Sequence, residues 1–122
     1  MNFLYRENTL VSVYRDNIKG FCVIADSDIE RNRFICTCPV GFMGFKDLSD
    51  KSEFNHYPMW WNDETDCIAF GVINLLNHNK ESTVFLERDF DNRLIHMYAA
   101  KDIKKGEELV IDYDCELWFE VK

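Results

Sequence analysis

The sequence lacks the features of a metal-binding, membrane-spanning or exported chain. Its five cysteines are an odd number, and no two of them have the C-x-x-C spacing of a zinc site or a redox pair. No apolar run approaches the roughly 20 residues of a membrane span, and the N-terminus does not have the pattern of a signal peptide. We therefore expect a soluble intracellular protein of the cytoplasm or nucleus, with reduced thiols, no metal site and no membrane partner.

Basic residues are scarce relative to acidic ones. Fourteen lysines and arginines are present beside 22 acidic residues, so the formal net charge is −8. This charge argues against a direct nucleic-acid partner, whose phosphates would be repelled, and favours a basic peptide. The stretch from Glu107 to Glu120 holds six acidic residues and no Lys or Arg. It either borders a groove for a basic peptide or is a solvated acidic end that aids solubility.

Repeats, linkers and low-complexity tracts are also missing, and 122 residues with 47% hydrophobic content suffice for one domain. Several short runs have the period-two alternation or the β-branched and aromatic content typical of strands. These runs are residues 10–14, 21–25, 34–38, 83–87, 94–99 and 108–111. Residues 67–76 are the best helix candidate, because their apolar residues are near helical spacing. We therefore predict a single mainly β domain over residues 1–122, with short helices.

The segment of residues 40–66 is the least periodic part of the chain and is rich in aromatic residues, including Trp60 and Trp61. In a β domain of this size, a long irregular aromatic segment often lines a site. The alternative is a second small core that covers the face of a sheet. The sequence leaves both readings open.

The most informative pattern joins three blocks of the chain. The run from Ala100 to Tyr113 contains Ile-x-x-Gly-Glu-Glu-Leu-x-x-Asp-Tyr, and Asn77 and His78 precede it by a few dozen positions. Residues 19–25 read Lys-Gly-Phe-Cys-Val-Ile-Ala. In this order the blocks resemble the SET domain, a family that transfers a methyl group from S-adenosylmethionine to a lysine side chain of a protein. The resemblance implies a fold of several small sheets with a knot-like C-terminal crossing.

The resemblance also implies S-adenosyl-L-methionine as the cofactor. Gly20 and Phe21 of the first block, together with Asn77 and His78, fall at the cofactor-binding positions of the family. A glycine such as Gly20 lets the backbone approach the methionine end of the cofactor closely. Trp118 lies where small SET proteins without a zinc-binding tail have an aromatic residue over the adenine ring. Trp118 either stacks on the adenine or anchors the C-terminus to the core.

The same resemblance implies a catalytic role for Tyr113, whose hydroxyl would orient the substrate amine. Aromatic side chains wall the lysine channel in this family, and Tyr57 and Tyr98 are candidates for that role. Ile111 falls where an aromatic residue often sets the number of methyl groups added. Without the resemblance, Tyr113 reads as a half-buried residue at a strand end, and the Asn-His pair as a helix C-terminal cap.

Three of the positions that depart from the pattern of the family allow an inactive module. Cys22 replaces the second glycine of the first block, Asn79 replaces a serine, and Ile111 replaces an aromatic residue. We predict a protein-lysine methyltransferase acting on a basic lysine-containing protein, such as a histone tail. A catalytically inactive SET-fold module that binds a peptide or the cofactor is the alternative. A domain this small has little surface for a substrate groove, and a homodimer formed through exposed aromatic residues would enlarge it.

Overall fold

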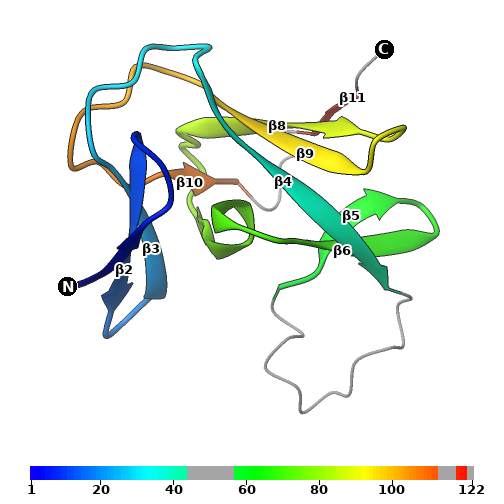
Figure 1. Cartoon of the computed structure of the whole chain (residues 1–122), viewed down its shortest axis with the longest axis horizontal. Helices are drawn as coiled ribbons and strands as arrows, with labels where there is room; N and C mark the ends of the chain where they lie inside the picture. The colour runs from blue at the N-terminus through cyan, green and yellow to red at the C-terminus, as the bar shows by residue number, and fades with distance from the viewer. Residues whose placement is uncertain (44–56, 113–117, 121–122) are drawn as a thin grey trace.

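The computed structural model describes residues 1–43, 57–112 and 118–120, and these residues form a mainly β fold (Figure 1). The prediction of a mainly β chain with short helices is thereby confirmed. The bounds of the elements, in chain order, are β1 Asn2–Arg6, β2 Val11–Asp16, β3 Gly20–Ala25, β4 Phe34–Met43, β5 Met59–Asn62, β6 Thr65–Ala69, the 3-10 helix η2 Val72–Leu75, β7 Asn77–His78, β8 Val84–Asp89, β9 Leu94–Ala99, β10 Val110–Ile111 and β11 Trp118–Glu120.

Within the described ranges the strands are grouped into three sheets. The first is antiparallel with the order β1-β2-β3, and the largest has the order β11-β8-β9-β4-β6-β5. The third is a short parallel pair of β10 and β7. In β9 every second residue is buried, namely Ile95, Met97 and Ala99, as the alternation of the sequence predicts for a strand with one core face.

The buried apolar side chains form a cluster to which all three sheets contribute. Val13 and Val23 come from the first sheet, Leu86 and Met97 from the largest, and Ile111 from the parallel pair. Burial of each such side chain contributes about 1.5–3 kcal/mol to folding. Because the core is shared, the short β7–β10 pair is held in place although it has few backbone hydrogen bonds of its own.

The segment that leads into β10 crosses the centre of the molecule. It first runs beside β3, where the Leu109 N–H donates to the Val23 carbonyl (2.8 Å) and the Ala25 N–H donates to the Glu107 carbonyl (2.9 Å). It then becomes β10, which lies between the first sheet and β8 in Figure 1 and pairs with β7. Residues far apart in the sequence are thus brought together around one short strand.

The helix predicted over residues 67–76 is wrong. Residues up to Ala69 belong to β6, and the helical turn is confined to Val72–Leu75. Gly71 adopts φ 145° and ψ −166°, a conformation that glycine alone adopts readily and that cannot continue a helix. An alternating apolar strand followed by a short buried turn has a spacing that is easily mistaken for a helical one. None of the helices among the described residues is long and apolar enough to cross a membrane.

Candidate cofactor site

The turn before β3 exposes a glycine backbone to open space. Asp16 closes this turn, because its Oδ1 accepts hydrogen bonds from the N–H groups of Ile18 (2.7 Å) and Lys19 (3.1 Å). These bonds hold the pKa of the Asp16 carboxyl below its ordinary value. Gly20 follows with φ +83°, and a Cβ placed there would meet no atom within 4 Å. Gly20 therefore has both the conformation and the space that a close approach of a ligand to the backbone requires.

Asn77 joins the three sequence blocks through its side-chain amide. Its Nδ2 donates to the Phe21 carbonyl (2.8 Å) and to Glu108 Oε2 (2.7 Å). The other carboxylate oxygen, Glu108 Oε1, lies 2.9 Å from Lys19 Nζ in an ion pair. The hydrogen bond to Glu108 raises the pKa of Lys19. The first block, the Asn-His block and the Gly-Glu-Glu-Leu block are thus connected by contacts of polar side chains.

Backbone pairing places the last block directly beside the Asn-His block. Val110 is opposite Asn77, and Ile111 is opposite His78, in the parallel ladder of β10 and β7. The Asn79 N–H continues this ladder by donating to the Ile111 carbonyl (3.1 Å). Ile111 is buried, whereas the His78 residue is exposed. Residue 113 therefore follows two positions after a strand that is fixed against the Asn-His block.

Cys22 lies beneath this cluster rather than in the open space next to Gly20. It is 2% exposed, and its Sγ lies 3.6 Å from Asn77 Nδ2. Burial, followed by the nearby Glu108 carboxylate, raises the pKa of the Cys22 thiol, so it stays neutral at physiological pH. The side chain that replaces the second glycine of the block is therefore accommodated inside the molecule.

Two of the residues predicted to line a substrate channel, Tyr98 and Tyr57, are among the described residues. On β9, Tyr98 stacks on Phe85 with ring centroids 5.3 Å apart, contacts Phe34 edge-on at 5.7 Å, and places its hydroxyl 3.5 Å from Glu87 Oε1. Met97 and Ala99, the neighbours of Tyr98 along β9, are buried in the core. The contacts of Tyr98 therefore lie on the face of the largest sheet that points away from the core. The carbonyl of Tyr57 accepts from Asn74 Nδ2 at 2.9 Å, which ties this residue to η2.

Two further predicted residues lie at or beyond the limits of the description. Tyr113 is outside the described residues. Trp118 begins β11, and its backbone is opposite Leu86 in a parallel pairing with β8. This pairing brings the C-terminal strand onto the edge of the largest sheet, as Figure 1 also shows.

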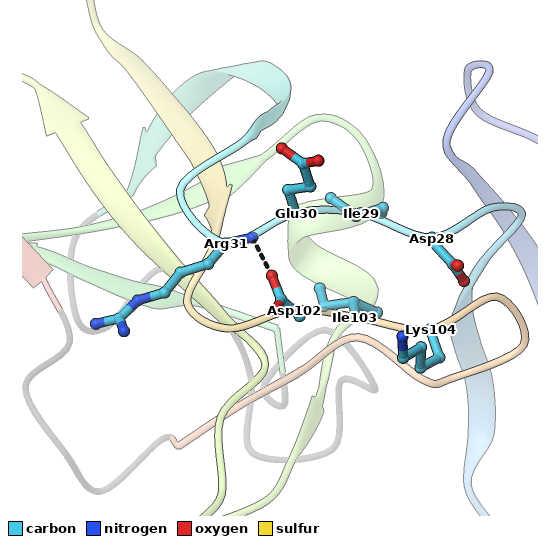
Figure 2. Close-up of a pocket in the computed structure, with 7 residues that line it drawn as sticks. All are labelled: Asp28, Ile29, Glu30, Arg31, Asp102, Ile103 and Lys104. Atoms are coloured by element: carbon cyan, nitrogen blue, oxygen red, sulfur yellow. Dashed lines mark hydrogen bonds between the residues drawn. The ribbon is translucent and has the colours of Figure 1, made fainter.

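An open pocket of about 480 Å³ lies between the loop after β3 and the loop before β10 (Figure 2). There the backbones of Ile29 and Ile103 pair through two hydrogen bonds of 2.8 Å, and the Arg31 N–H donates to Asp102 Oδ1 (2.9 Å). Gly20 begins β3, and the pocket lies beyond Ala25 at the other end of this six-residue strand, five residue steps or roughly 17 Å away. The residues that line the pocket are Asp28, Ile29, Glu30, Arg31, Asp102, Ile103 and Lys104. The pocket therefore does not include any of the predicted cofactor-binding residues.

The described residues contain no group of three or more His, Cys, Asp or Glu side chains arranged to hold a metal ion. Cys36 and Cys38 are buried neighbours on β4, and the hydrogen bond between their thiols raises the pKa of Cys36 and lowers that of Cys38. Burial raises the pKa of the Cys67 thiol to about 12. These thiols belong to the core.

Comparison with known proteins identifies the family. The sequence matches the SET domain over residues 20–114, which is more than half of the chain. The chain belongs to the SET domain family. The family predicted from the three sequence blocks is thereby confirmed, and Gly20, Asn77 and Gly106, one residue of each block, all fall within the matched range.

Individual relatives agree with this assignment. The chain is 30% identical over 105 residues to a histone-lysine N-methyltransferase of Schizosaccharomyces pombe described as specific for H3 lysine 37, and the match covers 84% of this chain and 71% of that protein. It is 25% identical over 126 residues to an H3 lysine-36 specific enzyme of Candida albicans, covering 93% of this chain but 15% of the other. A solved structure of a candidate histone methyltransferase from Plasmodium falciparum superposes with a TM-score of 0.71 at 19% identity, covering 87% of this chain and 94% of that one. The last likeness confirms the SET fold predicted from the sequence.

The SET domain blocks contain Lys19 and Glu108, but nothing in the sequence indicates that these residues pair, because they are 89 positions apart. The sequence likewise gave no sign of the role of Thr83, whose hydroxyl holds β10 in place by accepting a hydrogen bond from the Val110 N–H (2.9 Å). The one available signal for Glu108 is its place in the Gly-Glu-Glu-Leu run.

Proposed function

We propose that this SET domain is an S-adenosylmethionine-dependent protein-lysine N-methyltransferase. The observation that carries the proposal is the parallel pairing of β7 with β10, which sets Asn77 and His78 beside the residues that immediately precede Tyr113. The Asn77 amide also reaches the backbone of the glycine turn through the Phe21 carbonyl. One set of contacts thus unites all three blocks that the family uses for the cofactor and the catalytic tyrosine.

The residues around Gly20 and Asn77 fit an amino-acid moiety of the cofactor. Gly20 borders open space, and both hydrogens of Asn77 Nδ2 are engaged by protein acceptors, which leaves Oδ1 as an acceptor for a donor such as an ammonium group. The positive charge of the nearby Lys19 is paired with Glu108. When bound, S-adenosylmethionine would supply a methyl group on a sulfonium.

Methyl transfer requires an uncharged amine whose nitrogen lies in line with the bond between the methyl group and the sulfur. It requires no metal and no covalent intermediate. In the proposed reaction the hydroxyl of Tyr113 accepts or donates a hydrogen bond that orients the substrate amine. Alignment at contact distance contributes about 7–11 kcal/mol to lowering the barrier of such a reaction. A channel that excludes water, next to the positive sulfonium of the cofactor, would lower the pKa of the substrate lysine, since both disfavour the ammonium form.

A basic segment of a protein is the substrate that the charge of the chain favours. The formal net charge is −8, and the stretch from Glu107 to Glu120 holds six acidic residues and no Lys or Arg. Acidic residues attract lysine- and arginine-rich peptides and repel acidic ones. The two curated relatives are described as acting on lysines of histone H3. We therefore propose a histone tail or a similar basic segment.

Calorimetric titration with S-adenosylmethionine tests the cofactor first. Wild type is expected to bind with measurable heat and to melt at a higher temperature with the cofactor present, because a ligand held only by the folded state stabilises it. Asn77→Ala is expected to weaken binding. Asn92→Ala is the matched control, since Asn92 caps an exposed turn through Asp89. No heat at millimolar cofactor would contradict the proposal.

Turnover separates the enzyme from an inactive module of the same fold. Mass spectrometry of a lysine peptide is expected to show added methyl groups, and a peptide with flanking arginines is expected to react faster than a neutral one. This advantage should shrink at high salt, because exposed charges are screened beyond about 10 Å at 0.1 M ionic strength. Cofactor binding without methylation of any basic peptide would instead support the inactive module.

A further inference from the structure

Asn77 has an amide whose orientation is decided by its neighbours. One hydrogen of Nδ2 is directed to the Phe21 carbonyl (2.8 Å), and the other to Glu108 Oε2 (2.7 Å). The Cys22 sulfur is a third, weaker acceptor on the same side, at 3.6 Å. All of the groups that contact Nδ2 are acceptors. A carboxamide has two donors and one acceptor oxygen, so these contacts also define where the oxygen points.

Rotating the Asn77 amide by half a turn would place Oδ1 against a carbonyl and a carboxylate. Both hydrogen bonds would be lost, and the oxygen would face the negative charge of Glu108. Hydrogen bonds to a charged group are about twice as strong as neutral ones. The Glu108 carboxylate therefore contributes more than the Phe21 carbonyl to fixing the orientation of the Asn77 amide. Without Glu108, one carbonyl would remain to hold the amide.

Glu108 is itself held in a fixed position. Its Oε1 is paired with Lys19 Nζ at 2.9 Å, and its side chain is 18% exposed, against 54% for Lys19. Its backbone forms a bridge with Ile24 of β3. The carboxylate is therefore anchored from two sides and presents one oxygen to Asn77.

From this geometry we propose that Glu108 is the positioning residue of the cofactor site. Its carboxylate locks the Asn77 carboxamide with Oδ1 available to the donor groups of the cofactor, and it does so through Asn77 rather than by touching the cofactor. This inference rests on the proposed cofactor function. It adds that a residue of the Gly-Glu-Glu-Leu run sets cofactor affinity through a side chain that lies 31 positions away in the sequence.

The test compares Glu108→Gln with Glu107→Gln, a substitution of the same kind at the adjacent position. In Glu108→Gln one oxygen is replaced by an NH2 group, so the side chain can no longer accept from both Lys19 and Asn77. The dissociation constant for S-adenosylmethionine is expected to rise about 10- to 100-fold, the range of a charge-assisted hydrogen bond. Glu107 instead accepts from the Lys104 N–H (3.0 Å) and pairs with Lys101 (3.1 Å), so Glu107→Gln is expected to leave affinity unchanged.

A double-mutant cycle separates positioning from a general loss of structure. If Glu108 acts through Asn77, adding Glu108→Gln to an Asn77→Ala protein should weaken binding by less than twofold further. Equal additional weakening in both backgrounds would overturn the proposal. So would a Glu108→Gln protein that binds as tightly as Glu107→Gln. Circular dichroism melting of each variant shows that the protein is folded at the titration temperature.

The same set of measurements distinguishes this proposal from the proposed function. If wild type and Glu107→Gln bind no cofactor, the proposed function fails, and the cofactor role of Glu108 fails with it. If they bind and Glu108→Gln binds equally well, only the positioning role is overturned. The NMR signals of the Asn77 Nδ2 hydrogens in the cofactor-free protein give an independent reading. They are expected to shift upfield and exchange faster in Glu108→Gln but not in Glu107→Gln.

Discussion

Replacing Thr83 by valine would remove the side-chain support of β10 while keeping the shape of the residue. Thr83 is 4% exposed, and its Oγ1 accepts a hydrogen bond of 2.9 Å from the buried N–H of Val110. Two backbone bonds remain in the variant, from the Thr83 N–H to the Val110 carbonyl (3.0 Å) and from the Ala100 N–H to the Thr83 carbonyl (2.9 Å). The change leaves this buried N–H without its partner, and it also removes two longer contacts of 3.4 Å that the hydroxyl makes as a donor to the Glu108 and Val110 carbonyls.

The magnitude follows from that orphaned donor. A buried N–H without a partner costs about 1–3 kcal/mol, and valine fills nearly the same volume as threonine, so no cavity adds to this cost. A loss of about 2 kcal/mol is a large part of the 5–15 kcal/mol that stabilises a typical domain. With a urea dependence of about 1–3 kcal/mol per molar, the unfolding midpoint should fall by roughly 1 M.

Urea unfolding monitored by circular dichroism measures the loss, and hydrogen exchange at the Val110 amide locates it. Thr83→Ser is the matched control, because it keeps the hydroxyl and removes one buried methyl group, worth about 1 kcal/mol. The Val110 amide should lose its protection in Thr83→Val and keep it in Thr83→Ser. Equal protection in both variants would refute the reasoning, whatever the two midpoints are.

Further predictions concern a glycine, an acidic group and the catalytic residue. Gly71→Ala should destabilise the protein by about 2–5 kcal/mol in urea unfolding, because the new Cβ would lie 2.5 Å from Cys38 Sγ and the backbone has φ +145°. Gly20→Ala is the control and should cost about 1 kcal/mol, because a Cβ at that position meets no atom within 4 Å. The hydrogen bond from the Lys104 backbone lowers the pKa of Glu107 below its ordinary 4.5. The stabilisation from Glu107 is therefore complete above pH 4.5 and is lost as the pH falls through the lowered pKa. A plot of melting temperature against pH should be flatter on its acid side in Glu107→Gln than in wild type, and an unchanged acid side would contradict this. Tyr113→Phe should bind the cofactor like wild type and turn over far more slowly in the methylation assay, and full activity would show that its hydroxyl is not needed.

The class of the fold could be predicted from the sequence because local patterns report burial on one face of a strand. The alternation in residues 94–99 gave β9 correctly, since a strand with one core face repeats every two residues. The same reasoning failed at residues 67–76, where a strand, a glycine with φ +145° and a single turn of helix follow one another. A short apolar run does not distinguish these alternatives, because its spacing fits more than one of them.

The sequence by itself determined the family and the blocks that make up the candidate site, because these blocks are contiguous and occur in a fixed order. Only the tertiary structure decided which side chains meet. Lys19, Asn77 and Glu108 belong to three separate blocks, and their contacts arise from the register of β10 against β7 and from the course of residues 106–109 along β3. Tyr98, for the same reason, lies on the outer face of the largest sheet with Phe85. Register and strand order depend on how distant segments pack together, and no local spacing encodes that packing.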